Sequence, residues 1–433
     1  MIDLKLIRDQ KELVAKAIHD KCANVDLDLL IELDGKRVSS QQKLDELRAE
    51  RNRVSAEMPK GGRPDPAILE RAKALKEEIQ ALEAQYNVIE AEFLALYKKV
   101  PNIPTADTPV GLTEDENVVV RQWGTIRSFD FPIKNHAEIA EVRGWLDKER
   151  AGKVAGTRFG YLKGDLVRLQ MALVTWVMDT LSDESVIAKI IAEHKLNISS
   201  KPFTAVLPPY MIRTELYDAM DRLEPREDRY KIEGEDLWLQ GSAEHVLGSM
   251  YAGETFDEKE LPIRYLGYAT SFRAEAGTYG KDMEGIIRMH QFDKLEMESF
   301  SARETAHDEH LLFSGIQEYL MQQLEIPYQK LQKCTFDIGK PNAKGSDIEA
   351  WLPGQNKYRE THTADYMTDY QTRRLQTRVR RQGGELEFVH TNDATAFACG
   401  RALVAIIENY QNADMTVSIP TVLQGYMGNK KAI

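Results

Sequence analysis

The sequence predicts an α+β protein in which an N-terminal antiparallel helical hairpin, a coiled coil, precedes a larger domain built on an antiparallel sheet flanked by helices. Apolar residues follow helical spacing through two long segments of the first hundred residues. A cluster of prolines and glycines at 59–66 separates these segments. Beyond residue 104, helical patterns alternate with strand-like runs and turns, which favours antiparallel strands over βαβ units. We therefore expect two domains, 1–104 and 105–433.

The hairpin is predicted from two seams of apolar side chains. The second seam follows a four–three spacing without a miss over 68–100, whereas polar residues interrupt the first. Each helix would run roughly 40–50 Å. A hairpin of that length cannot pack along one globular core, so we expect it to project into solvent. The seam residues are Leu30, Leu33, Leu44, Leu47, Val54 and Met58 in the first helix and Ile68, Ala72, Leu75, Ile79, Leu82, Tyr86, Ile89, Phe93, Leu96 and Val100 in the second.

Charge narrows the classes of partner. The 433 residues carry 69 acidic and 57 basic side chains, for a formal net charge of −12, which excludes a basic, nonspecific nucleic-acid coat protein. Between residues 36 and 63, however, the bases outnumber the acids by four. On charge alone, a polyanion-binding arm and a plain dimerisation rod or spacer are equally good interpretations of this stripe. Its bases are Lys36, Arg37, Lys43, Arg48, Arg51, Arg53, Lys60 and Arg63.

Cysteine usage and the N-terminus indicate the compartment. Cys22, Cys334 and Cys399 lie too far apart in sequence for a zinc knuckle and are too few for a disulfide framework. No window approaches the roughly 18 consecutive apolar residues of a membrane span, and the charged N-terminus has no signal-peptide core. We expect a reduced cytoplasmic protein without a membrane partner.

The second domain is expected to begin with a linker at 105–135. The sequence contains no G-x-x-x-x-G-K-[ST] and no G-x-G, which excludes the P-loop, the Rossmann fingerprint and the kinase glycine-rich loop. Periodicity predicts a helix at 166–181 and strands at 237–240, 265–272, 287–300, 347–352 and 385–390.

The segment 268–300 is the most informative, because it is predicted to form a strand, a glycine-containing loop and a second strand. Arg273 and Glu275 would share a face of the first strand. A solvated sheet face is the plain interpretation. Two arginines, an aromatic ring and a carboxylate are also the groups that fork phosphate, stack adenine and pair an ammonium. On the second strand Arg288, His290, Phe292, Lys294 and Glu296 would share a face.

Two further sites carry weaker signals. Glu360 and Thr363 offer oxygen ligands of the kind that Mg²⁺ prefers. Arg401 lies in the first turns of an apolar helix, 400–408, where a buried arginine requires a partner. An ATP phosphate or a structural carboxylate would serve equally well.

Five runs, taken together, resemble a known family. Bacterial-type seryl-tRNA synthetases, which are class II aminoacyl-tRNA synthetases, carry similar motifs in the same order over nearly the whole length. The resemblance implies an α+β fold with a class II sheet, a tRNA-binding N-terminal arm and a homodimer. It implies ATP and Mg²⁺ as cofactors and L-serine and tRNA(Ser) as partners, and it leaves tRNA(Sec) open as a second tRNA. The runs are 158–165, 272–277, 290–296, 351–360 and 400–411.

The resemblance also assigns roles to individual residues. Arg273 and Arg401 would be catalytic, Glu360 and Thr363 would bind Mg²⁺, and Lys36, Arg37, Lys43, Arg48, Arg51 and Arg53 would bind tRNA. The ATP-binding set would be Arg273, Ala274, Glu275, Arg288, Met289, His290, Gln291, Phe292, Glu360, Thr361, His362, Thr363 and Arg401. The serine-binding set would be Ser242, Ala243, Glu244, Arg273, Glu296, Asp393 and Thr395.

Several positions depart from the family's usual pattern. Ser242 stands where the family usually has Thr, 393–396 reads Asp-Ala-Thr-Ala instead of Asn-Gly-Ser-Gly, and 360–363 reads Glu-Thr-His-Thr instead of Glu-(Ile/Val)-Ser-Ser. These departures cluster around the expected amino-acid pocket. An amino acid:carrier-protein ligase should lack the long arm, and a non-catalytic paralogue should lose Arg273, Glu296 or Arg401. The long arm and all three residues are present, which argues against both alternatives. A pocket that hydrogen-bonds the serine hydroxyl rejects alanine, and threonine must be excluded by space, so we expect serine to be preferred over both.

Overall fold

The computed structural model describes residues 1–58, 65–276 and 285–433. It divides into two compact units, Met1–Ile103 and Pro104–Ile433. Most of the predicted breaker at 59–66, with the bases Lys60 and Arg63, lies outside the described residues, as does Gly277 of the 272–277 run.

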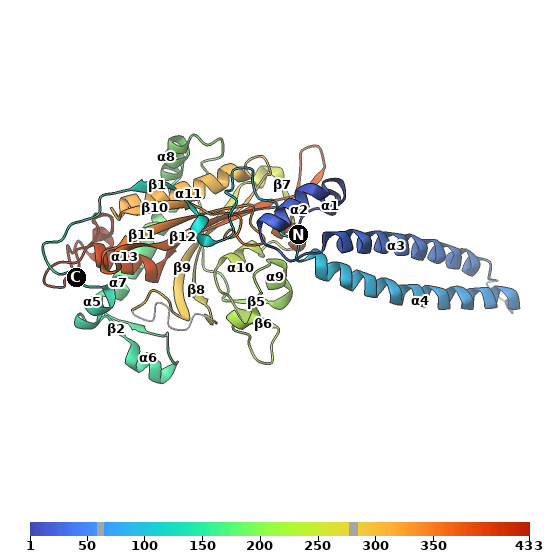
Figure 1. Cartoon of the computed structure of the whole chain (residues 1–433), viewed down its shortest axis with the longest axis horizontal. Coiled ribbons are helices and arrows are strands. Elements are labelled where there is room, and N and C mark those ends of the chain that lie inside the picture. Colours follow the sequence, from blue (N-terminus) through green and yellow to red (C-terminus); the bar gives the residue numbers. More distant parts are fainter. Residues whose placement is uncertain (59–64, 277–284) are drawn as a thin grey trace. The chain divides into compact units, whose positions relative to one another are not determined.

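The first unit is helical and contains the predicted hairpin. Helices α3 and α4 lie side by side in Figure 1, and a small core of seam residues joins them. Asp26 and Asp65 cap the two helices by accepting backbone N–H groups, and Pro66 occupies the first turn of α4. The prediction of an antiparallel helical hairpin is confirmed. The helices are α1 (Leu4–Asp9), α2 (Lys11–Asp20), α3 (Leu27–Ala56) and α4 (Pro66–Tyr97).

The second unit is built on a large sheet, as predicted. Eight of the described strands join in the order β1-β10-β11-β12-β15-β9-β8-β4. Neighbouring strands are antiparallel except for the parallel pair of β4 and β8 at one edge. The strands are β1 (Val118–Trp123), β4 (Thr204–Val206), β8 (Ile263–Phe272), β9 (Gln291–Ser301), β10 (Tyr328–Gln332), β11 (Lys344–Leu352), β12 (Lys357–Thr368) and β15 (His390–Ala398).

Helices and small sheets surround this platform. Helices α11 and α13 pack against its central strands, and α7 packs against α13. The helices are α5 (His136–Val142), α6 (Lys148–Val154), α7 (Asp165–Leu181), α8 (Glu184–His194), α9 (Thr214–Ala219), α10 (Glu244–Gly248), α11 (Ala306–Gln323), α12 (Tyr370–Leu375), α13 (Cys399–Asn409) and α14 (Thr421–Gln424). The small sheets contain β2 (Leu146–Asp147) with β3 (Tyr161–Leu162), β5 (Met211–Arg213) with β6 (Leu237–Leu239), and β7 (Thr255–Asp257) with β13 (Arg378–Arg380) and β14 (Leu386–Phe388).

Three predicted extents were wrong. The strand expected at 287–300 begins only at Gln291, and the one expected at 385–390 is split between β14 and the start of β15. The expected linker at 105–135 contains β1, an edge strand paired with β10. Val118, Val119 and Val120 are all exposed, so no alternation of burial marked β1 in the sequence. Within the described ranges, no helix combines the length and hydrophobicity needed to cross a bilayer.

Candidate active site

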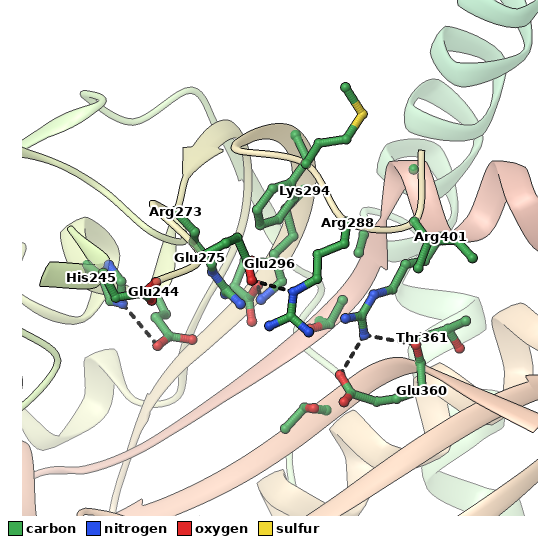
Figure 2. Close-up of a pocket in the computed structure, with 18 of the residues that line it drawn as sticks. Glu244, His245, Arg273, Glu275, Arg288, Lys294, Glu296, Glu360, Thr361 and Arg401 are labelled. Atoms are coloured by element: carbon green, nitrogen blue, oxygen red, sulfur yellow. Dashed lines mark hydrogen bonds and ion pairs between the residues drawn. The ribbon is translucent and has the colours of Figure 1, made fainter. Parts of the chain in front are cut away.

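A polar cavity of about 310 Å³ lies over the centre of the large sheet, where β9, β12 and β15 are neighbours and α13 begins (Figure 2). The structure brings together side chains from the predicted ATP, serine and metal sets. The predicted residues that line it are Glu244, Arg273, Glu275, Arg288, Met289, Phe292, Glu296, Glu360, Thr361, Thr363, Asp393, Thr395 and Arg401.

Strand alternation presents the side chains on the cavity floor. Phe292, Lys294 and Glu296 project from one face of β9, because side chains two residues apart share a face. The neighbouring strand β15 places Thr395 directly opposite Glu296. The predicted alternation is therefore correct for this half of the segment. It does not extend to Arg288 and His290, which precede the strand.

Arg273 lies just beyond the end of β8 and is held by backbone contacts. Its N–H donates to the carbonyl of His290 (2.9 Å), and its Nε donates to the carbonyl of Gly241 (3.1 Å). Its guanidinium carbon lies 5.3 Å from the centre of the Phe292 ring, within range of a cation–π contact. The remaining guanidinium N–H groups can bind an anion in the cavity.

Two more guanidinium groups line the cavity, each paired with a carboxylate (Figure 2). Arg288 pairs with Glu275, and Arg401 Nη1 lies 2.8 Å from Glu360 Oε1. Desolvation opposes ionisation of Glu360, but Arg401 outweighs it and holds the pKa of Glu360 below its usual value. Of the two partners that the sequence left open for Arg401, the structure shows the carboxylate.

Carboxylates dominate the opposite end of the cavity. Glu296 pairs with Lys294 and accepts a hydrogen bond from the Ser242 hydroxyl (3.2 Å). Desolvation is the main cause that raises the pKa of Glu296 to about 7; Lys294 opposes the shift and Glu244 adds to it. A carboxyl group with such a pKa binds an ammonium only when it has lost its proton.

Sequence reasoning missed Arg222 and Asp365 as site residues, and it placed Lys294 on the correct face without giving it a role. Arg222 Nε lies 2.9 Å from Glu244 Oε1, and its Nη2 lies 3.4 Å from Asp393 Oδ2. Asp365 could have been found, because it is two residues beyond Thr363 on β12 and therefore shares its face. Arg222 follows a short helix in a charged stretch that gives no periodic signal.

Two predicted histidines do not line the cavity. His362 lies on the other face of β12, where its ring packs 4.8 Å from Phe397 and burial lowers its pKa to about 3. His290 precedes β9, and its Nδ1 lies 2.9 Å from the carbonyl oxygen of Arg273. Both serve the framework of the site, the first as core and the second as a brace for Arg273.

Four more predicted residues lie outside the cavity lining. Ser242 is fully buried beneath Lys294 and Glu296 and reaches the cavity only through them. Ala243 packs in an apolar cluster with Leu247. Ala274 and Gln291 are likewise absent from the lining.

The predicted tRNA-binding bases of α3 divide into two groups. Arg37 lies 3.0 Å from Asp34 and stacks over Phe93, and Arg48 pairs with Glu83 across the hairpin (2.8 Å). Lys36 pairs with Glu32 one turn earlier. Among the described residues, Lys43, Arg51 and Arg53 are exposed and form no ion pair, so they are the bases of this set that can bind phosphate without breaking an ion pair.

Comparisons with known proteins decide the family. The family model of the seryl-tRNA synthetase N-terminal domain matches residues 1–104, and that of the tRNA synthetase class II core domain (G, H, P, S and T) matches residues 228–410. A serine–tRNA ligase of Nitrosopumilus maritimus is 39% identical over 438 residues, with all of both chains covered. The chain belongs to the seryl-tRNA synthetase family. A relative from Dictyoglomus turgidum, also a serine–tRNA ligase, is 39% identical and covers 99% of this chain and 98% of its own.

Solved structures agree with this family assignment. Seryl-tRNA synthetase from Pyrococcus horikoshii, complexed with ATP, has a TM-score of 0.86 at 36% identity and covers 100% of this chain and 99% of its own. The Naegleria fowleri serine–tRNA ligase with AMP gives 0.83 at 30% identity, covering 100% and 98%. The predicted fold class, family and class II ligase activity are confirmed.

Membership of the seryl-tRNA synthetase family raises the question of whether residues of the cavity could hold Mg²⁺. Glu360 and Thr363 both line the cavity and offer oxygen donors. Asp347 lies directly opposite Thr363 on β11 and adds a buried carboxyl group. An all-oxygen donor set with an ionised carboxylate fits a hard cation.

Proposed function

We propose that this cavity activates L-serine with ATP and that the seryl group is then transferred to the 3′ end of tRNA(Ser). One observation carries the proposal: Arg273, Arg288 and Arg401 line the cavity together with a carboxyl group, Glu296, suited to an amine. Polyphosphate and a zwitterionic amino acid require these opposite charges in a single cavity.

In the first step, the carboxylate of serine attacks the α-phosphorus of ATP in line and pyrophosphate leaves. Arg273 would pair with the α-phosphate and the serine carboxylate, and Arg401 with the γ-phosphate. The reaction needs no covalent nucleophile from the protein. Catalysis therefore comes from positioning and from stabilising the charge that develops on the phosphate oxygens.

Glu360 and Thr363 would hold Mg²⁺ beside the phosphates. When bound, the ion would neutralise phosphate charge. Binding of the γ-phosphate to Arg401 would release or share the Glu360 carboxylate, which is then available to a metal ion.

At the other end of the cavity, Glu296 would bind the serine ammonium. An incoming cation lowers the pKa of a neighbouring carboxyl group, so the substrate itself favours the ionised form of Glu296. Lys294 already holds Glu296 in place and would remain its second partner.

In the second step, a hydroxyl of the 3′-terminal ribose of tRNA attacks the seryl-adenylate. The hairpin would bind tRNA outside the anticodon through Lys43, Arg51 and Arg53. The match of residues 1–104 to the family's N-terminal domain supports a tRNA over a carrier-protein acceptor. A homodimer, a cytoplasmic location and charging of tRNA(Sec) stay predictions.

Serine-dependent exchange of pyrophosphate into ATP tests the first step. We expect serine to exceed threonine and alanine, because a site that hydrogen-bonds the hydroxyl rejects an analogue that lacks it. A stronger response to another amino acid would refute the serine assignment. Absence of exchange with all twenty amino acids would instead favour a non-catalytic paralogue.

Charge reversal on the hairpin tests the second step. In the triple variant Lys43→Glu, Arg51→Glu, Arg53→Glu, tRNA charging should fall and its salt dependence should flatten, while pyrophosphate exchange stays normal. Reversal of Lys73 and Lys76, exposed bases on α4, is compared with the double variant Arg51→Glu, Arg53→Glu and controls for a general effect of the same change in charge. An equal loss in both variants would refute a specific role for the α3 bases.

A further inference from the structure

Arg222 lines the end of the cavity where the carboxylates lie, and the proposed function gives it no role. Its side chain is 17% exposed, and three carboxyl groups surround it: Glu244 at 2.9 Å, Asp393 at 3.4 Å and Asp365 at 4.0 Å. An arginine in such a place either holds the fold together or binds the ligand.

The geometry of its contacts distinguishes these roles. Arg222 Nε is close to Glu244, yet no acceptor is aligned with its N–H, and the Nη2 contact with Asp393 is longer than the roughly 2.7–2.9 Å of a strong charge-assisted hydrogen bond. Arg264 shows what a structural arginine looks like in this protein. It is fully buried, pairs with Glu309 through Nε (2.7 Å) and Nη2 (2.6 Å), and also donates to backbone carbonyls. Arg222 has donor capacity left over, and it lines the cavity.

The sheet beneath Arg222 has too many carboxyl groups for one arginine. Asp365 lies opposite Asp393 in the β12–β15 pair, and Asp393 lies opposite Glu298 in the β15–β9 pair. Desolvation and the neighbouring carboxylates raise the pKa values of Asp393 and Glu298, because like charges opposite each other destabilise a sheet. This row therefore retains a demand for donors and cations. A substrate that brings an ammonium and a hydroxyl supplies both.

Asp393 is also within reach of the amino-acid subsite. Ligand oxygens of Glu244, Glu296 and Asp393 all lie within 4.8 Å of one another. Only two carbon atoms separate the ammonium of serine from its hydroxyl oxygen. If Glu296 binds the ammonium, the hydroxyl falls beside Asp393 and Arg222.

We propose that Arg222 and Asp393 together bind the side-chain hydroxyl of the amino acid, which makes Arg222 a specificity-determining residue of this chain. The inference rests on the proposed function. A hydroxyl both donates and accepts, a guanidinium only donates, and an ionised carboxylate only accepts. Arg222 therefore donates a hydrogen bond to the hydroxyl oxygen, while the ionised Asp393 accepts a hydrogen bond from the hydroxyl. Alanine would leave both charged groups without that partner, and threonine would place a methyl group against them.

The test compares serine with alanine in pyrophosphate exchange, in wild type and in Arg222→Met. Methionine keeps much of the volume and removes every donor. We expect kcat/KM for serine to fall about 10- to 100-fold, the range for a hydrogen bond to a charged group, while kcat/KM for alanine changes little. The serine-to-alanine ratio should therefore collapse, and Arg222→Lys should restore part of it.

Three further readings separate the explanations. If kcat/KM falls by the same factor for serine and alanine, or does not fall for either, the serine-to-alanine ratio is unchanged. That result would overturn the inference and leave Arg222 as a support for its neighbours. If Arg222→Met does not fold, as judged by its melting temperature, Arg222→Gln and Arg222→Lys decide the same ratio, and an unchanged ratio in both overturns the inference. Wild-type enzyme without serine-dependent exchange would refute the proposed function instead, before any variant is measured.

Discussion

Serine activation should weaken as the pH falls below 7, because Glu296 must be ionised to bind an ammonium group. Desolvation raises the pKa of Glu296 to about 7 in the ligand-free cavity, from an ordinary value of 4.5. About half of the sites at pH 7 and about one tenth at pH 6 would carry an ionised Glu296, so kcat/KM for serine should fall about fivefold between pH 7 and pH 6. Above pH 8 about nine tenths or more of the sites are ionised, so the profile should level off.

The variant Lys294→Met tests whether Glu296 is the group whose ionisation sets the acidic limb of the pH profile. Lys294 is the nearest cation to Glu296 and lowers its pKa, so removing it should move the acidic limb of the profile to higher pH. Pyrophosphate exchange at limiting serine and saturating ATP, followed from pH 5.5 to about 8.5, measures the limb. A limb at the same pH in wild type and Lys294→Met would refute the assignment to Glu296.

Other predictions concern catalysis and stability. Arg273→Ala should lower kcat for pyrophosphate exchange about 10²- to 10³-fold with little change in melting temperature; near-normal exchange would remove Arg273 from the reaction. Arg264→Met should lower the free energy of unfolding by about 3–5 kcal/mol in urea, because it leaves Glu309 buried without its charge partner; a loss below about 1 kcal/mol would contradict this. Ile79→Ala should destabilise the hairpin by about 2–3 kcal/mol, seen as an earlier loss of helical circular dichroism, and should leave pyrophosphate exchange unchanged.

Short-range periodicity made the floor of the cavity predictable. Phe292, Lys294 and Glu296 share a face for the same reason that Thr363 and Asp365 do, because β-strand geometry fixes that relation wherever a strand runs without a bulge. The seam of the hairpin was equally visible. Leu44 and Leu47 in the first helix, and Leu75 and Ile79 in the second, follow helical spacing and are buried.

Long-range pairing could not be predicted in the same way. Glu360 faces Arg401 across 41 residues, and Arg222 reaches Asp393 across 171, so no local pattern links either pair. His362 was misplaced because the run 360–363 was taken as one contact surface, whereas His362 and Thr363 lie on opposite faces of the strand. A register shift between the pairs Ile348–His362 and Glu349–Glu360 brings Glu360 to the cavity side, and no local pattern predicts that shift.

The ion pairs of the cavity explain how it can hold so many charges. In each of three ion pairs, one residue carries a charge that a substrate needs and the other is a partner that can be exchanged. The pairs are Arg288 with Glu275, Arg401 with Glu360, and Glu296 with Lys294. A phosphate would replace a carboxylate beside an arginine, and an ammonium would join a lysine beside Glu296. Because these protein charges are already partly desolvated, binding exchanges partners instead of stripping water from an open surface, which is less costly. The same exchange aligns the substrates: arginines favour polyphosphate at one end and carboxylates favour the amine at the other, so the serine carboxylate is directed toward the α-phosphorus.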